Sequence, residues 1–209
     1  MVKALIWTCL LLVTFQAAPP QKLSTPSNEL PDEDYAIYSL VLQTQFVRNG
    51  VERIVLGDHT LMAYPPIMMA MTQFGGSEDA KKIRESANKE TLQDYEQRNK
   101  TPVALAPKFT LKVPLVLMSA AERDRVFMLT GEGEKKVASP KGMDAFQKLY
   151  PKSPGFMNIS RIGFNSDRTQ AFLYVGFVCG GLCGEGHIFL LVKDNDVWKI
   201  QHAAMTWVS

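Results

Sequence analysis

The stretch TQAFLYVGFVCGGLCGEGHIFLLVKDNDVWKIQHAAM, residues 169–205, decides the fold class of this 209-residue chain. It holds three runs rich in β-branched and aromatic residues, separated by short glycine-rich or polar connections. A similar run, GFMNISRIGF at 155–164, precedes them. Short connections join antiparallel neighbours, because parallel strands need a crossover of about a dozen residues or more. The sequence therefore predicts a four-stranded antiparallel β-meander in the carboxyl-terminal third.

Helices are expected upstream of this meander. Pro31 and the acidic residues after it suit the first turn of a helix, which apolar residues at three- and four-residue spacing continue to about residue 46. Residues 77–100 are polar with one narrow apolar stripe, which is typical of a surface helix. These helices must cover the sheet face that carries Phe189 and Leu191. We therefore expect an α+β fold with N-terminal helices packed on one face of the meander.

Residues 1–18, MVKALIWTCLLLVTFQAA, have the layout of a secretory signal peptide. Lys3 precedes an apolar run, and two alanines end the segment. The run is about 12 residues long, whereas a permanent membrane helix needs about 20. We expect export to the periplasm or the medium with removal of the segment. A membrane-tethered, uncleaved form is the alternative.

The rest of the chain reads as one domain. Residues 19–30 are rich in Pro, Ser and Thr and predict a flexible lead-in, and 31–209 form a single α+β domain. Without Lys3 the formal charge is near zero, so nucleic acid is a poor partner and an unknown protein or small molecule is expected instead. No sequence motif implies a cofactor.

The two cysteines that follow the leader, Cys179 and Cys183, are expected to form a disulfide in an oxidising compartment. At the ends of a three-residue hairpin loop their Cα atoms would lie about 5 Å apart, and so small a ring stabilises by about 2 kcal/mol. The alternative is a metal or redox site in which His187 joins the two sulfurs, a set that suits copper(I) or zinc. The spacing matches no strong zinc pattern.

Four polar residues are the candidates for a ligand pocket: Glu185, His187, Tyr174 and Arg161. Strand alternation places His187 on the same face as Phe189, so we expect a buried and partnered histidine. No catalytic residue is assigned, because neither a Gly-x-Ser-x-Gly elbow nor a His-Glu-x-x-His motif occurs. The glycines around the cysteines are expected to be turn and bulge residues.

Residues 159–200, together with DEDYAIYSLVL at 32–42, resemble a group of uncharacterised bacterial exported proteins. In that group a strand ending in Gly-Phe-Asn leads to a long hairpin and a closing Trp-Lys-Ile/Val strand. The resemblance implies an exported bacterial protein and carries over no catalytic residue. The order of elements is also similar, more weakly, to the cone-shaped fold of nuclear transport factor two, although His202 and Ser209 depart from that family's usual ending.

Three functional hypotheses follow. The first is a non-enzymatic exported binding domain that the Cys179–Cys183 bridge stiffens. The second is a small-molecule enzyme, hydrolase-like, with a pocket between helices and sheet; Ser160, His187 and an acid would be the residues for a triad. The third is a copper or redox protein acting at the cysteines.

Overall fold

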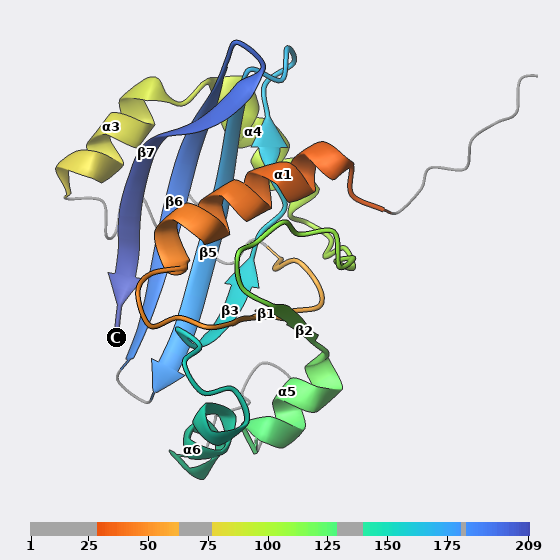
Figure 1. Ribbon diagram of the computed structural model, residues 1–209. Helices are drawn as coiled ribbons and strands as arrows, with labels where there is room; N and C mark the ends of the chain where they lie inside the picture. The colour runs from red at the N-terminus through yellow and green to blue at the C-terminus, as the bar shows by residue number, and fades with distance from the viewer. Residues whose placement is uncertain (1–28, 63–76, 129–139, 181–182) are drawn as a thin grey trace, which may run out of the picture.

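A mixed β-sheet forms the centre of the molecule (Figure 1). In the computed structural model, which describes residues 29–62, 77–128, 140–180 and 183–209, the sheet has seven strands. Six follow the order β2-β1-β3-β5-β6-β7, and β4 also pairs with β5. The strands are β1 (Ile54–Gly57), β2 (Leu115–Met118), β3 (Phe156–Ile159), β4 (Gly163–Phe164), β5 (Gln170–Gly180), β6 (Cys183–Asp194) and β7 (Val197–Val208).

The α+β class is confirmed, but the four-stranded, purely antiparallel sheet is wrong. β1 pairs in parallel with both β2 and β3, and only the pairs from β3 to β7 are antiparallel. Two helices, α3 (Glu78–Ser86) and α4 (Lys89–Arg98), lie between β1 and β2 in the chain, so the connection is long enough for parallel pairing. Local sequence patterns do not specify which distant strand a short strand joins.

The β6–β7 hairpin turns at Asn195 and Asp196, whose φ angles are 49° and 60°. Two positive values are what a two-residue type I′ turn requires. An uninterrupted register from this two-residue turn would pair Phe189 with His202, and that expectation is wrong. β7 contains an extra residue at a bulge there, so Phe189 pairs with Ala203 instead.

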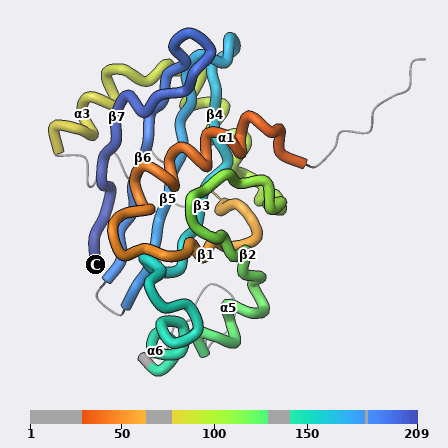
Figure 2. The backbone as a smooth tube through the Cα atoms, in the orientation of Figure 1, coloured from red at the N-terminus to blue at the C-terminus, as the bar shows by residue number. Residues whose placement is uncertain are grey.

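One face of the sheet is covered by α1 (Asp32–Val41), which continues into a π-helical turn, η1 (Leu42–Phe46). Figures 1 and 2 show this helix crossing β5 and β6. Its buried side chains join the apolar residues of five strands: Ile54, Leu56, Met157, Ile159, Phe164, Ala171, Leu173, Val175, Phe189 and Leu191. This is the largest apolar cluster among the described residues.

Helices also cover the opposite face, so the prediction of helices on one face only is wrong. Side chains of α3 and α4 pack against Phe172, Ile188 and Leu190. Those of α5 (Ala120–Val126) and α6 (Pro140–Leu149) pack in the cluster that contains Val55 and Phe156. The physical reason is visible in β6, where an unbroken apolar run presents apolar residues to both sides and both must be buried.

The polar segment 77–100 forms two helices rather than one. The Ser77 hydroxyl accepts a hydrogen bond from the backbone N–H of Ala80 at 3.2 Å and so caps α3. Asn88 interrupts the segment and caps α4, because its side-chain oxygen accepts from the N–H of Glu90 at 3.0 Å.

The predicted signal peptide, 1–18, and most of the predicted lead-in lie outside the described residues. Leu30, at the end of that lead-in, is buried in the cluster under α1. Within the described ranges, no helix combines the length and the apolar character needed to cross a membrane.

A candidate ligand pocket beside the β5–β6 hairpin

Cys179 and Cys183 form a disulfide at the tip of the β5–β6 hairpin, as predicted, with their Cα atoms 5.1 Å apart. Both sulfurs are therefore bonded to each other. Among the described residues, no group of three or more His, Cys, Asp or Glu side chains is arranged to hold a metal ion.

One glycine near the tip, Gly186, also has a role in packing. Gly186 lies inside β6, where a Cβ would collide with the indole of Trp207. This close approach lets Trp207 Nε1 donate a hydrogen bond across the strand to the hydroxyl of Tyr174, at 2.8 Å. The pairing of β6 with β7 also shifts register between Gly186 and His187, as expected of a glycine at a bulge. Gly186 therefore combines the predicted bulge position with a packing role within the strand.

Tyr174 and Arg161 do not lie with the other two candidate residues. Tyr174 packs against the cluster under α3 and α4, on the opposite face from His187. Arg161 lies at the break between β3 and β4, where one of its Nη atoms donates to the carbonyl of Arg98 at 3.1 Å. Ser160 is buried, and its hydroxyl donates to the carbonyl of Arg161 and accepts from the N–H of Tyr174.

His187 lies on the α1 face with Phe189, as alternation predicts. Its ring centroid is 5.9 Å from that of Phe46 and 6.2 Å from that of Phe189. Its Nε2 lies 2.8 Å from a carboxylate oxygen of Glu185. The side chain of His187 is 22% exposed and that of Glu185 is 39% exposed. The structure thus brings two of the four candidate residues together at the solvent boundary of the aromatic core.

A cavity of about 170 Å³ lies beside this pair, and we call it the hairpin pocket. It is formed by the end of η1 and the loop after it, the approach to β3, and the hairpin. The residues that line it are Gln45, Phe46, Arg48, Val51, Pro154, Phe177, Glu185, His187 and Phe189. Three phenylalanine rings form its apolar walls, and four polar side chains supply hydrogen-bonding groups.

The π-helical turn sets the position of the residues at one wall. Thr44 donates its hydroxyl to the carbonyl of Leu40 at 2.7 Å, and the backbone N–H of Val47 reaches back five residues to Leu42. Such turns are rare and occur often at functional sites. In this chain the turn ends on Phe46, whose ring contacts both Phe177 and His187.

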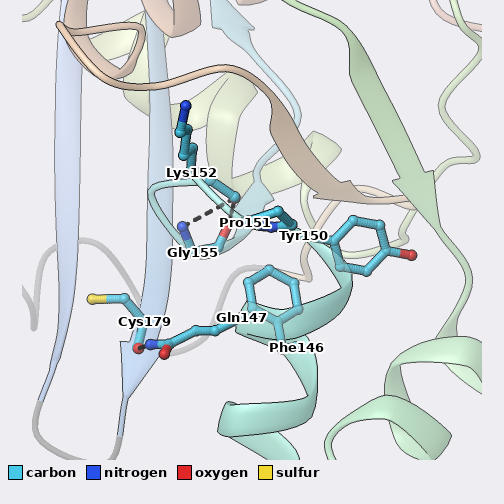
Figure 3. A pocket seen from close by; sticks show the side chains of 8 residues that line it. Phe146, Gln147, Tyr150, Pro151, Lys152, Gly155 and Cys179 are labelled. Carbon is cyan, nitrogen blue, oxygen red and sulfur yellow. Dashed lines mark hydrogen bonds between the residues drawn. The ribbon is translucent and has the colours of Figure 1, made fainter.

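Two other hollows are lined in part by polar groups that already have partners. One, of about 290 Å³, lies between α6 and the tip of β5 (Figure 3). There Gln147 donates to the carbonyl of Cys179 at 3.0 Å, Tyr150 donates to Glu122 at 2.9 Å and Lys152 pairs with Glu52. The third, of about 280 Å³, lies beyond β1 and β2. Its open lining includes the hydrogen-bonded pair Asp58–His59.

No family model, no curated protein and no solved structure matches this chain. The hairpin pocket must therefore be interpreted from its own residues.

Sequence reasoning identified Glu185 and His187 but missed Phe46 and Arg48, which reach the pocket from the other end of the chain. Phe46 was predicted only as part of a core-facing helix. No local signal marks the change from α- to π-helix. The one sequence feature that could have indicated a pocket residue here is the position of Phe46, a large aromatic residue at a helix end just before Asn49-Gly50.

Proposed function

We propose that this protein is an exported, non-enzymatic binding domain whose recognition site is the hairpin pocket. The observation that carries the proposal is a cavity of about 170 Å³ that joins three phenylalanine rings to the Glu185–His187 pair. Small-molecule sites combine apolar and aromatic walls with a few polar groups that fix orientation, and this lining has that composition.

The volume limits what the pocket can hold. An apolar protein cavity of about 150 Å³ accommodates one benzene molecule. The hairpin pocket therefore suits a single six-membered ring with a small polar substituent, a group smaller than the ligands that typical drug-sized pockets of 300–1,000 Å³ enclose.

The disulfide supports the same proposal. Cys179 and Cys183 each lie two residues from a lining residue, Phe177 and Glu185 respectively. A covalent link at the tip keeps the two strands of the hairpin in register and so limits the motion of both side chains. Disulfides persist in oxidising compartments, which agrees with the leader-like residues 1–18.

The enzyme hypothesis ranks second. The Glu185–His187 pair is the kind of group that moves protons in general acid–base catalysis. However, none of the described lining residues is Ser, Thr or Cys. The hydroxyl of Ser160 is already bonded to the backbone and therefore does not supply the nucleophile that a hydrolase triad needs.

Titration with benzyl alcohol, a neutral single ring, tests the binding function. The chain has three histidines, so the imidazole signals in an NMR spectrum can be assigned from single His→Gln variants. We expect benzyl alcohol to shift the His187 signals saturably and to leave those of His59 and His202 unchanged. Saturable shifts elsewhere, with none at His187, would contradict the proposal.

Two valine-to-phenylalanine variants, one inside the pocket and one outside it, test where the ligand binds. Val51→Phe adds a ring from the loop that lines the cavity, and we expect it to weaken benzyl alcohol binding about tenfold or more. Val197→Phe makes the same change at a side chain 58% exposed on β7 and should leave binding unchanged. Equal affinities for the two variants would rule out the hairpin pocket as the site.

A further inference from the structure

We infer that the ligand of the hairpin pocket is a small aromatic carboxylic acid, whose ring packs among Phe46, Phe177 and Phe189 and whose carboxylate pairs with Arg48. This inference rests on the proposed binding function and adds the charge of the ligand to it.

The partners of the two charged lining residues, Glu185 and Arg48, carry the inference. Glu185 already has a partner, because its carboxylate lies 2.8 Å from His187 Nε2. Arg48 lines the same cavity and makes no ion pair with any of the described residues. Arg48 therefore supplies a guanidinium group with which the carboxylate of a ligand can pair.

The geometry of Arg48 leaves the tip of its guanidinium group available. Its Nε donates to the backbone carbonyl of Gln45 at 3.1 Å, which ties the side chain to the end of the π-helical turn. That bond leaves the Nη atoms for a ligand. A planar guanidinium matches a carboxylate with two parallel hydrogen bonds, a fit that lysine does not reproduce.

The apolar walls of the pocket favour an aromatic ring for the part of the ligand that does not carry the charge. Phe189 is almost fully buried, and Phe46 is 7% exposed. Phe46 lies edge-on to Phe177 with their centroids 6.0 Å apart and an interplanar angle of 78°. Edge-to-face and offset contacts of this kind are the arrangements that aromatic rings prefer, so a further ring can join the cluster. The volume of about 170 Å³ matches one ring, which is why the inference names a single-ring acid.

Four probes that share or lack the ring and the charge test the inference: phenylacetate, benzyl alcohol, benzylamine and acetate. We expect phenylacetate to bind with a Kd of about 0.1–1 mM at low salt, a range reasonable for so few atoms. It should bind about fivefold or more tightly than benzyl alcohol, while benzylamine and acetate bind more weakly than either. Raising the salt concentration should weaken phenylacetate and leave benzyl alcohol unaffected.

Arg48→Met removes the charge and keeps much of the apolar stem. We expect this variant to bind phenylacetate and benzyl alcohol equally, with about a five- to tenfold loss for the acid. Lys89→Met removes an exposed charge at the start of α4, which packs on the opposite face, and should change neither affinity.

The outcomes separate this inference from the proposed function. If all three ring compounds bind alike at His187, or if benzylamine binds best, the acid preference is wrong while the ring-binding function stands. If Arg48→Met keeps the preference, the assigned residue is wrong. If no ring compound perturbs His187, both proposals are wrong.

Discussion

The two ends of the face that α1 covers are built in different ways. At the amino end of α1, charged side chains fill the space between helix and sheet. Glu33 accepts hydrogen bonds from Lys193 at 2.5 Å, Arg168 at 2.8 Å and Trp198 at 3.0 Å. At the carboxyl end, the hairpin pocket remains open beside three phenylalanine rings.

The amino end of α1, which we call the closed end, also contains a buried acid, Asp34. Asp34 is fully buried, with its carboxylate 3.6 Å from Arg168 and 4.0 Å from Arg98. Neither of its oxygens has a hydrogen-bond donor among the described residues. Both arginines also lie over the ring of Phe164, at 3.8 and 5.4 Å from its centroid.

The comparison indicates why one end is a candidate site and the other is structural. At the amino end of α1, long arginine and lysine side chains lie over the rings of Phe164 and Trp198. Rigid phenylalanine rings near a glycine-rich hairpin cannot close the space between them. Charge density alone is therefore a poor guide to the site in this molecule, because Glu33 in the charged cluster is already bonded to Lys193, Arg168 and Trp198.

The largest expected effect is a loss of stability, and it compares a phenylalanine of the core with one on the wall of the pocket. Phe189→Ala should lower the free energy of unfolding by about 3–5 kcal/mol, because this ring is almost fully buried. Phe177→Ala, on the pocket wall and only partly buried, should cost about 1–2 kcal/mol. Urea denaturation measures both. Equal losses would mean that the pocket wall is as tightly packed as the core.

The next effect tests the closed end. Burial raises the pKa of Asp34 to about 6 from its ordinary 3.8, because lost hydration outweighs the attraction of Arg98 and Arg168. The folded state therefore holds the proton more tightly than the unfolded state, and stability falls as the pH rises from about 4 to 6. Asp34→Asn should be more stable than the parent protein by about 2–3 kcal/mol at pH 7 and by almost nothing below pH 4.

Glu33 provides the control with the opposite sign. Its partial burial favours the neutral form, but hydrogen bonds from Lys193, Arg168 and Trp198 outweigh this and lower its pKa to about 2. Its contribution to stability is present above pH 4.5 and is lost as the pH falls toward 2. Glu33→Gln should therefore destabilise at pH 7, and less below pH 4.5. Thermal unfolding at several pH values distinguishes the two variants, and parallel profiles would contradict both assignments.

The last stability effect concerns the hairpin tip. Replacing both Cys179 and Cys183 with Ala should lower the free energy of unfolding by about 2 kcal/mol, because the ring they close is short. Ring binding at the hairpin pocket should weaken even at temperatures where the variant is fully folded. Unchanged affinity for benzyl alcohol in the folded variant would show that the bridge does not organise the pocket.

Much of the hairpin half of the fold could be predicted from the sequence. Asn195-Asp196 between two apolar runs specifies a tight turn, and the cysteine spacing specifies a bridge across a short loop. Both signals are local. The parallel pairing of β1 with β2 and β3 could not be predicted in this way, because it joins segments far apart in the chain whose patterns are alike.

The site was predictable to the same extent. Strand alternation places His187 with Phe189, and Glu185 lies two residues away on the same face. Tyr174 is likewise a polar aromatic residue in a strand, but its side chain points to the other face, where its hydroxyl accepts a hydrogen bond from Trp207. Arg48 and Phe46 depend on how α1 lies over the sheet, which is a property of the tertiary packing.

The π-helical turn has a consequence for how this helix tolerates a change of length. A π-helical turn contains one residue more than the α-helical turn it replaces, so losing one residue within 42–46 would leave an ordinary α-helix. The wider turn absorbs the extra residue locally, so the residues on either side of it keep the directions that they would have in the shorter helix. Phe46 would therefore still face His187 after such a deletion, and the wall of the pocket is compatible with a helix of either length.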